Sequence, residues 1–222
     1  MLTIKDLAVS FPSRFGDFSA ISDVDMTIAP GEIHGLVGES GAGKSTVGAA
    51  VIGLLSAPGY IANGTLTLGD TNLRNLTDEQ AHAIRGDRIS MIFQDPQTSL
   101  NPLMTIEDQL IETIQAHSDT SYGAAHKRAV DLLEEIGIKD AAKRIKAYPH
   151  QFSGGMRQRV VIALAICTDP ELIIADEPTT ALDVAVQSQV LDLIRRLAKV
   201  RKIAFMLITH DIGVIAQIAD RV

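Results

Sequence analysis

The chain has 222 residues, of which 46% are hydrophobic and 21% are charged, and its formal net charge is −7. This is the composition of an ordinary globular domain with a sizeable core, and the lack of any block of Lys or Arg argues against a nucleic-acid partner. No apolar run approaches 18 residues, and residues 1–6 lack the apolar core of a signal peptide, so the chain is expected to stay where it is made. The single cysteine, Cys167, excludes an internal disulfide and is expected to be a buried, unreactive thiol.

The N-terminal part alternates apolar and polar residues at 1–9 and again at 21–28. This period predicts two half-buried antiparallel strands. The segment between them, 11–18, is expected to be a turn, and it carries three of the six phenylalanines: Phe11, Phe15 and Phe18. A ring exposed here could stack on a nucleotide base, and anchoring of the hairpin in the core is an equally good interpretation.

A glycine-rich loop follows an apolar run of strand length at 33–37 and leads into a helix expected to begin at Lys44. It fits the pattern G-x-x-x-x-G-K-S/T in the strand–loop–helix context of a phosphate-binding loop. Glycines permit positive φ and close approach, so backbone N–H groups can surround a polyphosphate at the positive end of the helix dipole. Lys44 supplies a charge for the β- and γ-phosphates, and the Ser45 hydroxyl is placed to bind Mg²⁺. The predicted contact residues are Gly38, Glu39, Ser40, Gly41, Ala42, Gly43, Lys44, Ser45 and Thr46.

Several short elements are expected between this helix and residue 98. Turn signals at 58–59 and 63–64 flank an alternating, strand-like run at 65–68. A capping-box pattern at 77–80 predicts the start of a short helix. A compact apolar run at 89–93 predicts a buried strand, and the polar turn after it places Gln94 at a strand end, where ligand contacts collect.

From Leu103 to about Cys167 the apolar residues follow the helical period. We expect an inserted helical lobe that interrupts the series of strand and helix units. Near its end, Ser153 and a pair of glycines enter a helix expected to begin at Met156 or Arg157. This is the geometry of a second anion-binding helix N-terminus.

Two acids end a buried, parallel-type strand predicted at 172–177. Carboxylates at that edge of a sheet project into the crevice where α/β proteins bind ligands. Asp176 is expected to hold Mg²⁺, directly or through water, and Glu177 to position and deprotonate water; helix capping would explain one acid but not both. An amphipathic helix at 185–200 and a buried strand at 203–208 follow, and His210 after that strand is expected to act in the site.

Taken in order, these motifs resemble those of the nucleotide-binding subunit of ATP-binding-cassette (ABC) transporters over nearly the whole chain. Residues 38–46 resemble the Walker A motif, Gln94 the Q-loop, 172–176 Walker B, 181–183 the D-loop with Asp183, and His210 the switch histidine. The signature motif is matched by Ser153, Gly154, Gly155 and Gln158. The amino-acid sequences of residues 92–102 and 148–159 are similar to those of the bacterial dipeptide, oligopeptide and nickel importer branch.

The resemblance implies an α/β fold: a P-loop NTPase core with a mostly parallel sheet, an N-terminal antiparallel β subdomain and an inserted α-helical subdomain. Residues 1–222 would form a single ABC ATPase domain, with 1–98 and 168–222 in the core and the antiparallel subdomain and 99–167 in the helical signature subdomain. Members of this branch continue past the position of residue 222. We therefore expect a truncated chain or one half of a tandem protein, with a weakly anchored last helix.

The resemblance also implies a head-to-tail dimer that holds ATP between Walker A of one chain and the signature motif of the other. The helical lobe would hold the two phosphate-binding helix N-termini apart within one chain, and two copies solve that geometry. Ser45, Gln94 and Asp176 would gather around Mg²⁺; Ser153, Gly154, Gly155 and Gln158 would serve the partner's ATP; Lys44, Glu177 and His210 would be catalytic. Phe11 is the best match to the aromatic that stacks on adenine, and Phe15 and Phe18 compete with it.

The function implied is ATP hydrolysis that drives import of peptides or related small solutes across a bacterial inner membrane. The dimer partner would be a second copy or a homologous ATPase, on the cytoplasmic face of the membrane. Separate transmembrane permease subunits would dock at Gln94 and the lobe at about 95–150, whose surface should carry an apolar groove. An extracytoplasmic solute-binding protein would be an indirect partner.

Other classes of P-loop protein fit the sequence less well. A non-transport ABC ATPase acting on ribosomes or DNA commonly carries coiled-coil insertions or basic arms, and none is visible. A GTPase would need an Asn-Lys-x-Asp-type guanine reader, which the sequence lacks. A small-molecule kinase would leave the signature motif and Glu177 unexplained, and a module that binds ATP without hydrolysing it would not need Glu177 and His210.

Overall fold

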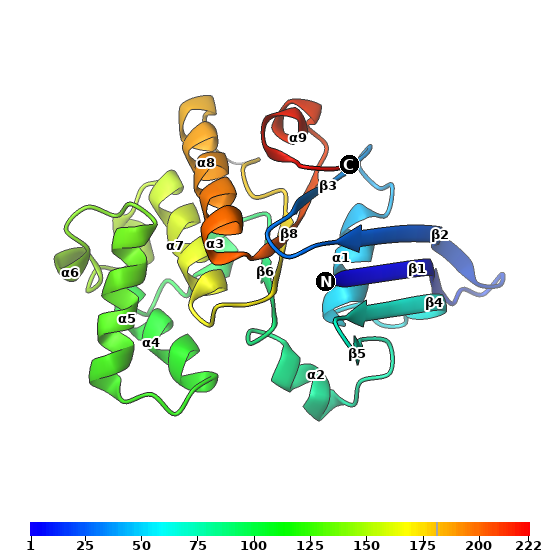
Figure 1. The fold of residues 1–222 in the computed structure, drawn as a ribbon, viewed down its shortest axis with the longest axis horizontal. Coiled ribbons are helices and arrows are strands. Elements are labelled where there is room, and N and C mark those ends of the chain that lie inside the picture. Colours follow the sequence, from blue (N-terminus) through cyan, green and yellow to red (C-terminus); the bar gives the residue numbers. More distant parts are fainter. Residues whose placement is uncertain (181) are drawn as a thin grey trace.

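A computed structural model describes residues 1–180 and 182–222 of the chain. Within these ranges the strands form two four-stranded sheets, one antiparallel with the order β2-β1-β4-β5 and one parallel with the order β3-β8-β7-β6 (Figure 1). The strands are β1 (Leu2–Phe11), β2 (Phe18–Ile28), β3 (Ile33–Val37), β4 (Tyr60–Leu68), β5 (Thr71–Asn72), β6 (Ile89–Ile92), β7 (Leu172–Asp176) and β8 (Ala204–Thr209). The predicted combination of a parallel sheet with an N-terminal antiparallel sheet is confirmed.

The helices lie between and around the two sheets. They are α1 (Lys44–Ile52), α2 (Asp78–Ile84), α3 (Pro96–Ser99), α4 (Ile106–Ala116), α5 (Tyr122–Glu135), α6 (Ala141–Arg144), a 3₁₀ turn (Pro149–Gln151), α7 (Gly154–Ile166), α8 (Val184–Arg201) and α9 (Ile212–Ile218). Helices α4 to α7 gather on the side of the molecule away from the antiparallel sheet, as the predicted helical lobe requires (Figure 1). The capping box predicted at Thr77 and Gln80 is present at the start of α2.

The parallel sheet separates two hydrophobic clusters. Alternate residues of β7 point to opposite faces, with Leu172 and Ile174 in one cluster and Ile173 and Ala175 in the other. The first cluster contains α1 and the antiparallel sheet, so α1 is sandwiched between the two sheets. The second contains α4, α5, α7, α8 and α9. This arrangement fixes the carboxyl ends of the parallel strands next to the start of α1.

The antiparallel sheet departs from the predictions in two ways. β1 and β2 extend to Phe11 and Phe18, which pair directly, so the turn is shorter than expected. The predicted turn at 63–64 is wrong, because these residues lie inside β4. The pairing of β1 with β4 shifts between Lys5 and Ala8, and the β1 backbone approaches so closely that a Cβ on Gly64 would lie 2.5 Å from the carbonyl oxygen of Asp6. Gly64, with φ of 94°, serves a β-bulge instead of a turn.

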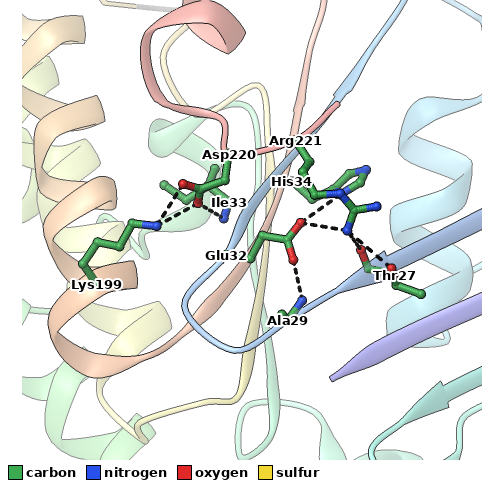
Figure 2. A network of polar contacts seen from close by, with 8 residues as sticks. All are labelled: Thr27, Ala29, Glu32, Ile33, His34, Lys199, Asp220 and Arg221. Carbon is green, nitrogen blue, oxygen red and sulfur yellow. Dashed lines mark hydrogen bonds and ion pairs between the residues drawn. The ribbon is translucent and has the colours of Figure 1, made fainter.

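The last helix is firmly attached, contrary to the expectation that it would be weakly anchored. α9 buries Val214, Ile215 and Ile218. The residues after it are tied to β3 and α8: the Asp220 carboxylate accepts hydrogen bonds from the backbone N–H of Ile33 and from Lys199, both at 2.9 Å (Figure 2). The Gly35 N–H donates to the carbonyl oxygen of Arg221 at 2.8 Å. Buried apolar contacts and backbone pairing thus anchor this segment, and neither was visible in the sequence pattern.

Neither α8 nor any other helix within the described ranges is both long and apolar enough to cross a lipid bilayer. Cys167 is buried, as predicted, and burial raises the pKa of its thiol to about 12. A thiol with so high a pKa is not a nucleophile at neutral pH.

Candidate nucleotide-binding site

A cavity of about 890 Å³ opens beside the carboxyl ends of β3, β7 and β8. This volume is in the range of pockets that hold a ligand of nucleotide size. The predicted site residues that line it are Gly38, Glu39, Ser40, Gly41, Gly43, Lys44, Ser45, Thr46, Gln94, Asp176, Glu177 and His210. The fold therefore brings the phosphate loop and the acids after β7 into one cavity, although more than 120 residues separate them in the chain.

The start of α1 depends on a glycine. Gly43 precedes the helix with φ of 87°, a left-handed conformation, and a Cβ there would lie 2.3 Å from Cγ2 of Ile21. Among the described residues, no side chain caps this helix. The first N–H groups of α1 therefore face the cavity as donors for an anion.

Lys44 is almost fully buried, with 8% of its surface exposed. Its ammonium donates to the carbonyl oxygens of Gly38, at 2.9 Å, and Glu39, at 2.7 Å. These bonds hold the loop around the ammonium and use two of its three donors. Ala42 is not among the described lining residues, and its N–H closes a turn onto Glu39 at 3.2 Å. The prediction that Ala42 contacts phosphate is therefore not matched by its position.

Asp176 and Ser45 both line the cavity. Burial raises the pKa of Asp176 and the neighbouring charge of Glu177 adds to the effect, while a hydrogen bond from Ser45 and the charge of Lys44 oppose it. A nearby cation would stabilise the ionised form of such a half-buried carboxylate. Mg²⁺ usually takes one or two protein carboxylates and completes its shell with phosphates and water. The Asp176–Ser45 pair fits such an ion. Among the described residues, no three or more His, Cys, Asp or Glu side chains cluster as a metal site.

Glu177 follows β7, and its carboxylate lies at the centre of a cluster of hydrogen-bonding side chains. Oε1 is 2.8 Å from Nδ1 of His210, and Oε2 accepts from Nε2 of Gln94 at 2.9 Å and from the Thr180 hydroxyl at 3.0 Å. Burial opposes ionisation, but the hydrogen bonds from His210 and Thr180 and the charge of Lys44 outweigh it and hold the pKa of Glu177 below its usual value. The carboxylate is therefore ionised at neutral pH and can accept a proton.

The backbone of Glu177 is also strained. Its φ is 49°, which is unfavourable for a residue with a side chain, and its N–H donates to the carbonyl oxygen of Ile208 at 2.8 Å. Strain of this kind persists where the surrounding structure enforces it and is typical of functional sites. The bond to β8 places the Glu177 carboxylate beside His210.

The signature residues are not among the described residues that line the cavity. Ser153 caps α7, its hydroxyl accepting from the N–H of Met156 at 3.4 Å, so the helix begins at Gly154 and not at 156 or 157 as predicted. Gly155 lies against α8, where a Cβ would come within 2.3 Å of Cγ1 of Val186. Gln158 is only 1% exposed, and its Nε2 has no hydrogen-bond partner among the described residues. The prediction that Gln158 contacts a partner's ATP is wrong in this structure, because its side chain points into the protein.

The D-loop is described in part. Ala181, within the predicted motif, lies outside the described residues. Asp183 caps α8, and its carboxylate accepts from the N–H of Val186 at 3.0 Å. In this structure its role is to start the helix that supports Gly155.

Comparison with known proteins identifies the family. The model of the ABC transporter family matches residues 21–180. The chain belongs to this family. It is 46% identical over its whole length to the oligopeptide transport ATP-binding protein OppD of Salmonella typhimurium, of which it covers 66%, and 48% identical to OppD of Bacillus subtilis, of which it covers 62%. It is also 46% identical to the dipeptide transport ATP-binding protein DppD of Bacillus subtilis, of which it covers 67%. The chain thus spans about two thirds of these curated relatives.

Solved structures agree with this assignment. A dimeric bacterial ABC transporter cassette, MJ0796, superposes with a TM-score of 0.85 at 28% identity, over 99% of this chain and 92% of that one. A dimeric post-hydrolysis state of the same cassette, bound to ADP and Pi, gives a TM-score of 0.83 at 28% identity, over 96% and 90% of the two chains. The predicted ABC ATPase fold and the resemblance to the dipeptide and oligopeptide branch are confirmed.

In this ABC transporter domain the aromatic residue beside the cavity is not the expected one. Phe18 lines the cavity and is 65% exposed, whereas Phe11 is not among the described lining residues. The Phe11 ring lies against Gly59 instead, so closely that a Cβ on Gly59 would come within 2.5 Å of the Phe11 Cε1. Phe15 is fully exposed in the hairpin turn. The choice of Phe11 therefore does not match the geometry, and the pairing of Phe11 with Phe18 across the hairpin could have pointed to the second ring.

A groove of about 560 Å³ lies between the core and the helical lobe. Its lining is mainly apolar and includes Ile52, Leu54, Met91, Phe93, Val161 and Leu164. Phe93 and Leu54 are about half exposed, and Gln94 follows Phe93 directly in the chain. An apolar groove was expected on the lobe at 95–150. The groove beside Phe93 is shared between α7, α1 and β6, and a second hollow of about 710 Å³ lies on the lobe itself, lined in part by Met104, Ile111 and Tyr122.

Proposed function

We propose that the chain is the ATP-hydrolysing domain of a transporter that imports peptides or related small solutes across a bacterial inner membrane. The observation that carries this proposal is the ionised Glu177, held by three side chains in the cavity that also contains Lys44 and the start of α1. The relatives described above carry peptide-transport names, which favours transport over work on ribosomes or DNA.

In this proposal, Lys44 and the N–H groups at the start of α1 bind the β- and γ-phosphates. Asp176, Ser45 and Gln94 would hold Mg²⁺, which would neutralise charge on the phosphate oxygens when bound. His210 steadies the γ-phosphate. Hydrolysis of this kind depends mainly on positioning and charge stabilisation.

Glu177 orients the attacking water and takes its proton. As the water oxygen bonds to the γ-phosphorus, the bond to the bridging oxygen breaks and ADP leaves. A base in this role must be ionised, and the lowered pKa of Glu177 meets that condition.

The second half of the site comes from another chain. Ser153 and Gly154 are exposed and Gly155 is partly buried at the start of α7, and all three lie outside the cavity of their own chain. A head-to-tail pair would bring this helix N-terminus to the γ-phosphate bound at the partner's α1. The partner is a second copy or a homologous ATPase, and ATP bound between them drives the dimer together.

The base of the nucleotide stacks on the hairpin of β1 and β2. Phe18 is the ring placed for this contact, and Phe11 pairs with it on the same face of the hairpin. Phe11 is therefore proposed to support the ring that makes the contact.

The groove beside Phe93 receives a short helix of a transmembrane permease subunit. Its half-exposed apolar side chains suit an amphipathic helix. Gln94 then links the groove to the cavity, so docking and hydrolysis can influence each other. The chain lies peripherally at the cytoplasmic face of the membrane, and an extracytoplasmic solute-binding protein delivers the solute.

The substitution Glu177→Gln tests the proposal. It keeps the shape of the side chain and removes the proton acceptor, so hydrolysis of Mg-ATP should fall roughly 10²–10⁴-fold while ATP binding persists. Glu134→Gln, on the exposed face of α5, is the matched control and should change neither. If Glu177→Gln hydrolysed ATP at near the parental rate, the role given to Glu177 would be wrong.

A further inference from the structure

The loop after β7 joins Thr180 to Glu177 twice. The Thr180 hydroxyl donates to Oε2 of Glu177 at 3.0 Å, and the Thr180 N–H donates to the Glu177 carbonyl oxygen at 3.3 Å. The two residues thus close a tight turn whose first residue has the positive φ noted above. We propose that Thr180 is a positioning residue that keeps the Glu177 carboxylate aimed at the attacking water while ATP is bound. This inference rests on the proposed function and gives that site a further residue.

The three neighbours of the carboxylate differ in what else they must do. Gln94 and His210 come from other parts of the chain, after β6 and β8, and each has a second duty in the proposed mechanism. Gln94 would turn toward the Mg²⁺ site, and His210 would turn toward the γ-phosphate. Once they do, Glu177 loses two of the three contacts that orient it.

Thr180 has no such second duty, and it moves with Glu177 because the same turn carries both. Its hydroxyl binds Oε2, whereas His210 lies against Oε1. When His210 moves to the phosphate, Oε1 is left to face the water and Oε2 stays held. A hydrogen bond to a charged carboxylate is among the stronger ones, so a single donor can fix the rotamer.

The hydrolysis step needs no reactant other than water and ATP. Water gives its oxygen to the γ-phosphorus and one proton to Oε1 of Glu177, and ADP leaves with the bridging oxygen. Thr180 keeps its own proton throughout. Its contribution is orientation, so its loss should slow turnover and leave ATP binding unchanged.

The test compares Thr180→Val with Thr180→Ser. Valine keeps the branched shape and removes the hydroxyl, whereas serine keeps the hydroxyl. For Thr180→Val we expect kcat to fall about tenfold at saturating Mg-ATP, with the KM for ATP within about twofold of the parental value. Thr180→Ser should retain more than half of the parental kcat. Thr180→Ala gives a second hydroxyl-free variant if the valine variant melts at a lower temperature than the parent.

The lifetime of the dimer gives a second readout of the role of Thr180. If hydrolysis is slow but ATP binding is intact, the Mg-ATP dimer should last longer in Thr180→Val than in the parent, as seen by light scattering. A parental kcat in both hydroxyl-free variants would overturn the inference. So would a serine variant as slow as the valine one, or a tenfold rise in KM. These results are separate from failure of the proposed function, which a fully active Glu177→Gln would indicate.

Discussion

The two glycine-led helix N-termini, at α1 and α7, are built for opposite situations. Among the described residues α1 has no side-chain cap, and its first residue, Lys44, is buried in the cavity. α7 is capped by its own Ser153 and starts on the surface. An uncapped helix start inside a cavity awaits a ligand from solution, whereas a capped start on the surface is stable alone and becomes useful when another molecule meets it. The contrast supports one site completed by two chains.

The glycines at the two places also serve different needs. Gly43 requires both a left-handed backbone and close contact with Ile21. Gly155 meets only a close contact, with Val186 on α8. The phosphate loop therefore depends on backbone conformation, and the signature helix depends on how tightly it packs against α8.

The largest expected effect lies at α1. Lys44→Ala removes the buried ammonium and its bonds to Gly38 and Glu39. Because charge-assisted hydrogen bonds to phosphate are strong, ATP affinity should fall roughly 100-fold or more, as measured by calorimetric titration. Glu177→Gln, which keeps ATP binding in this account, is the control. Parental affinity in Lys44→Ala would show that the loop binds phosphate without it.

A smaller effect, at α7, separates packing from recognition. A Cβ on Gly155 would collide with Val186, whereas one on Gly154 would meet only Cδ2 of Leu182 at 4.0 Å. Overpacking typically costs about 1–3 kcal/mol, so Gly155→Ala should lower the melting temperature by roughly 2–10 °C. Val186→Ala in the same chain should restore much of that loss.

Gly154→Ala is the matched comparison for the same helix. It should leave the melting temperature unchanged and still reduce ATP hydrolysis, because the new methyl group would stand between α7 and the partner's phosphate. Unchanged hydrolysis with a normal melt would mean that Gly154 does not approach a nucleotide.

The smallest expected effect is at Asp220, whose contacts support both helices. Asp220 joins β3, which leads into the loop before α1, to Lys199 on α8, which supports α7 (Figure 2). Burial opposes ionisation of Asp220, but the bonds from Ile33 and Lys199 outweigh it and lower the pKa of Asp220. Its contribution to stability is therefore present above the usual pKa of an aspartate and disappears as the pH falls through the lowered value.

Thermal melts of Asp220→Asn as a function of pH test this contribution. Because Asp220 and Lys199 are both partly exposed, the melting temperature should fall by only about 2 °C at pH 7. The difference between variant and parent should shrink as the pH falls through the lowered pKa of Asp220. A difference that persists in acid would point to packing and not to charge as its cause.

The sequence predicted best where local chemistry dictates conformation. The bounds of β3 and the first residue of α1 match because the phosphate-loop pattern itself fixes the strand, the turn and the helix start. The acids after β7 and His210 were placed correctly because the ends of parallel strands meet at one edge of the sheet.

Contacts between distant segments explain the rest. Asn63 and Gly64 form a common turn signal. They lie in a strand because β4 pairs with β1 at a β-bulge, a contact that the local sequence does not show. The helix with Gln158 is apolar on several sides, so its period does not say which side faces inward. Phe18 was only one of three candidate rings, and Thr180 was missed, because their contacts depend on the width of a hairpin and on the shape of a turn.

The most direct test of the two-chain site is the mass of the Glu177→Gln variant by light scattering, with and without Mg-ATP. We expect a change from one chain mass to two, because ATP bound at α1 recruits α7 of a second copy. A Lys44→Ala, Glu177→Gln double variant should stay at one chain mass. If Glu177→Gln also stays at one chain mass with ATP binding confirmed, two copies of this chain do not complete the site.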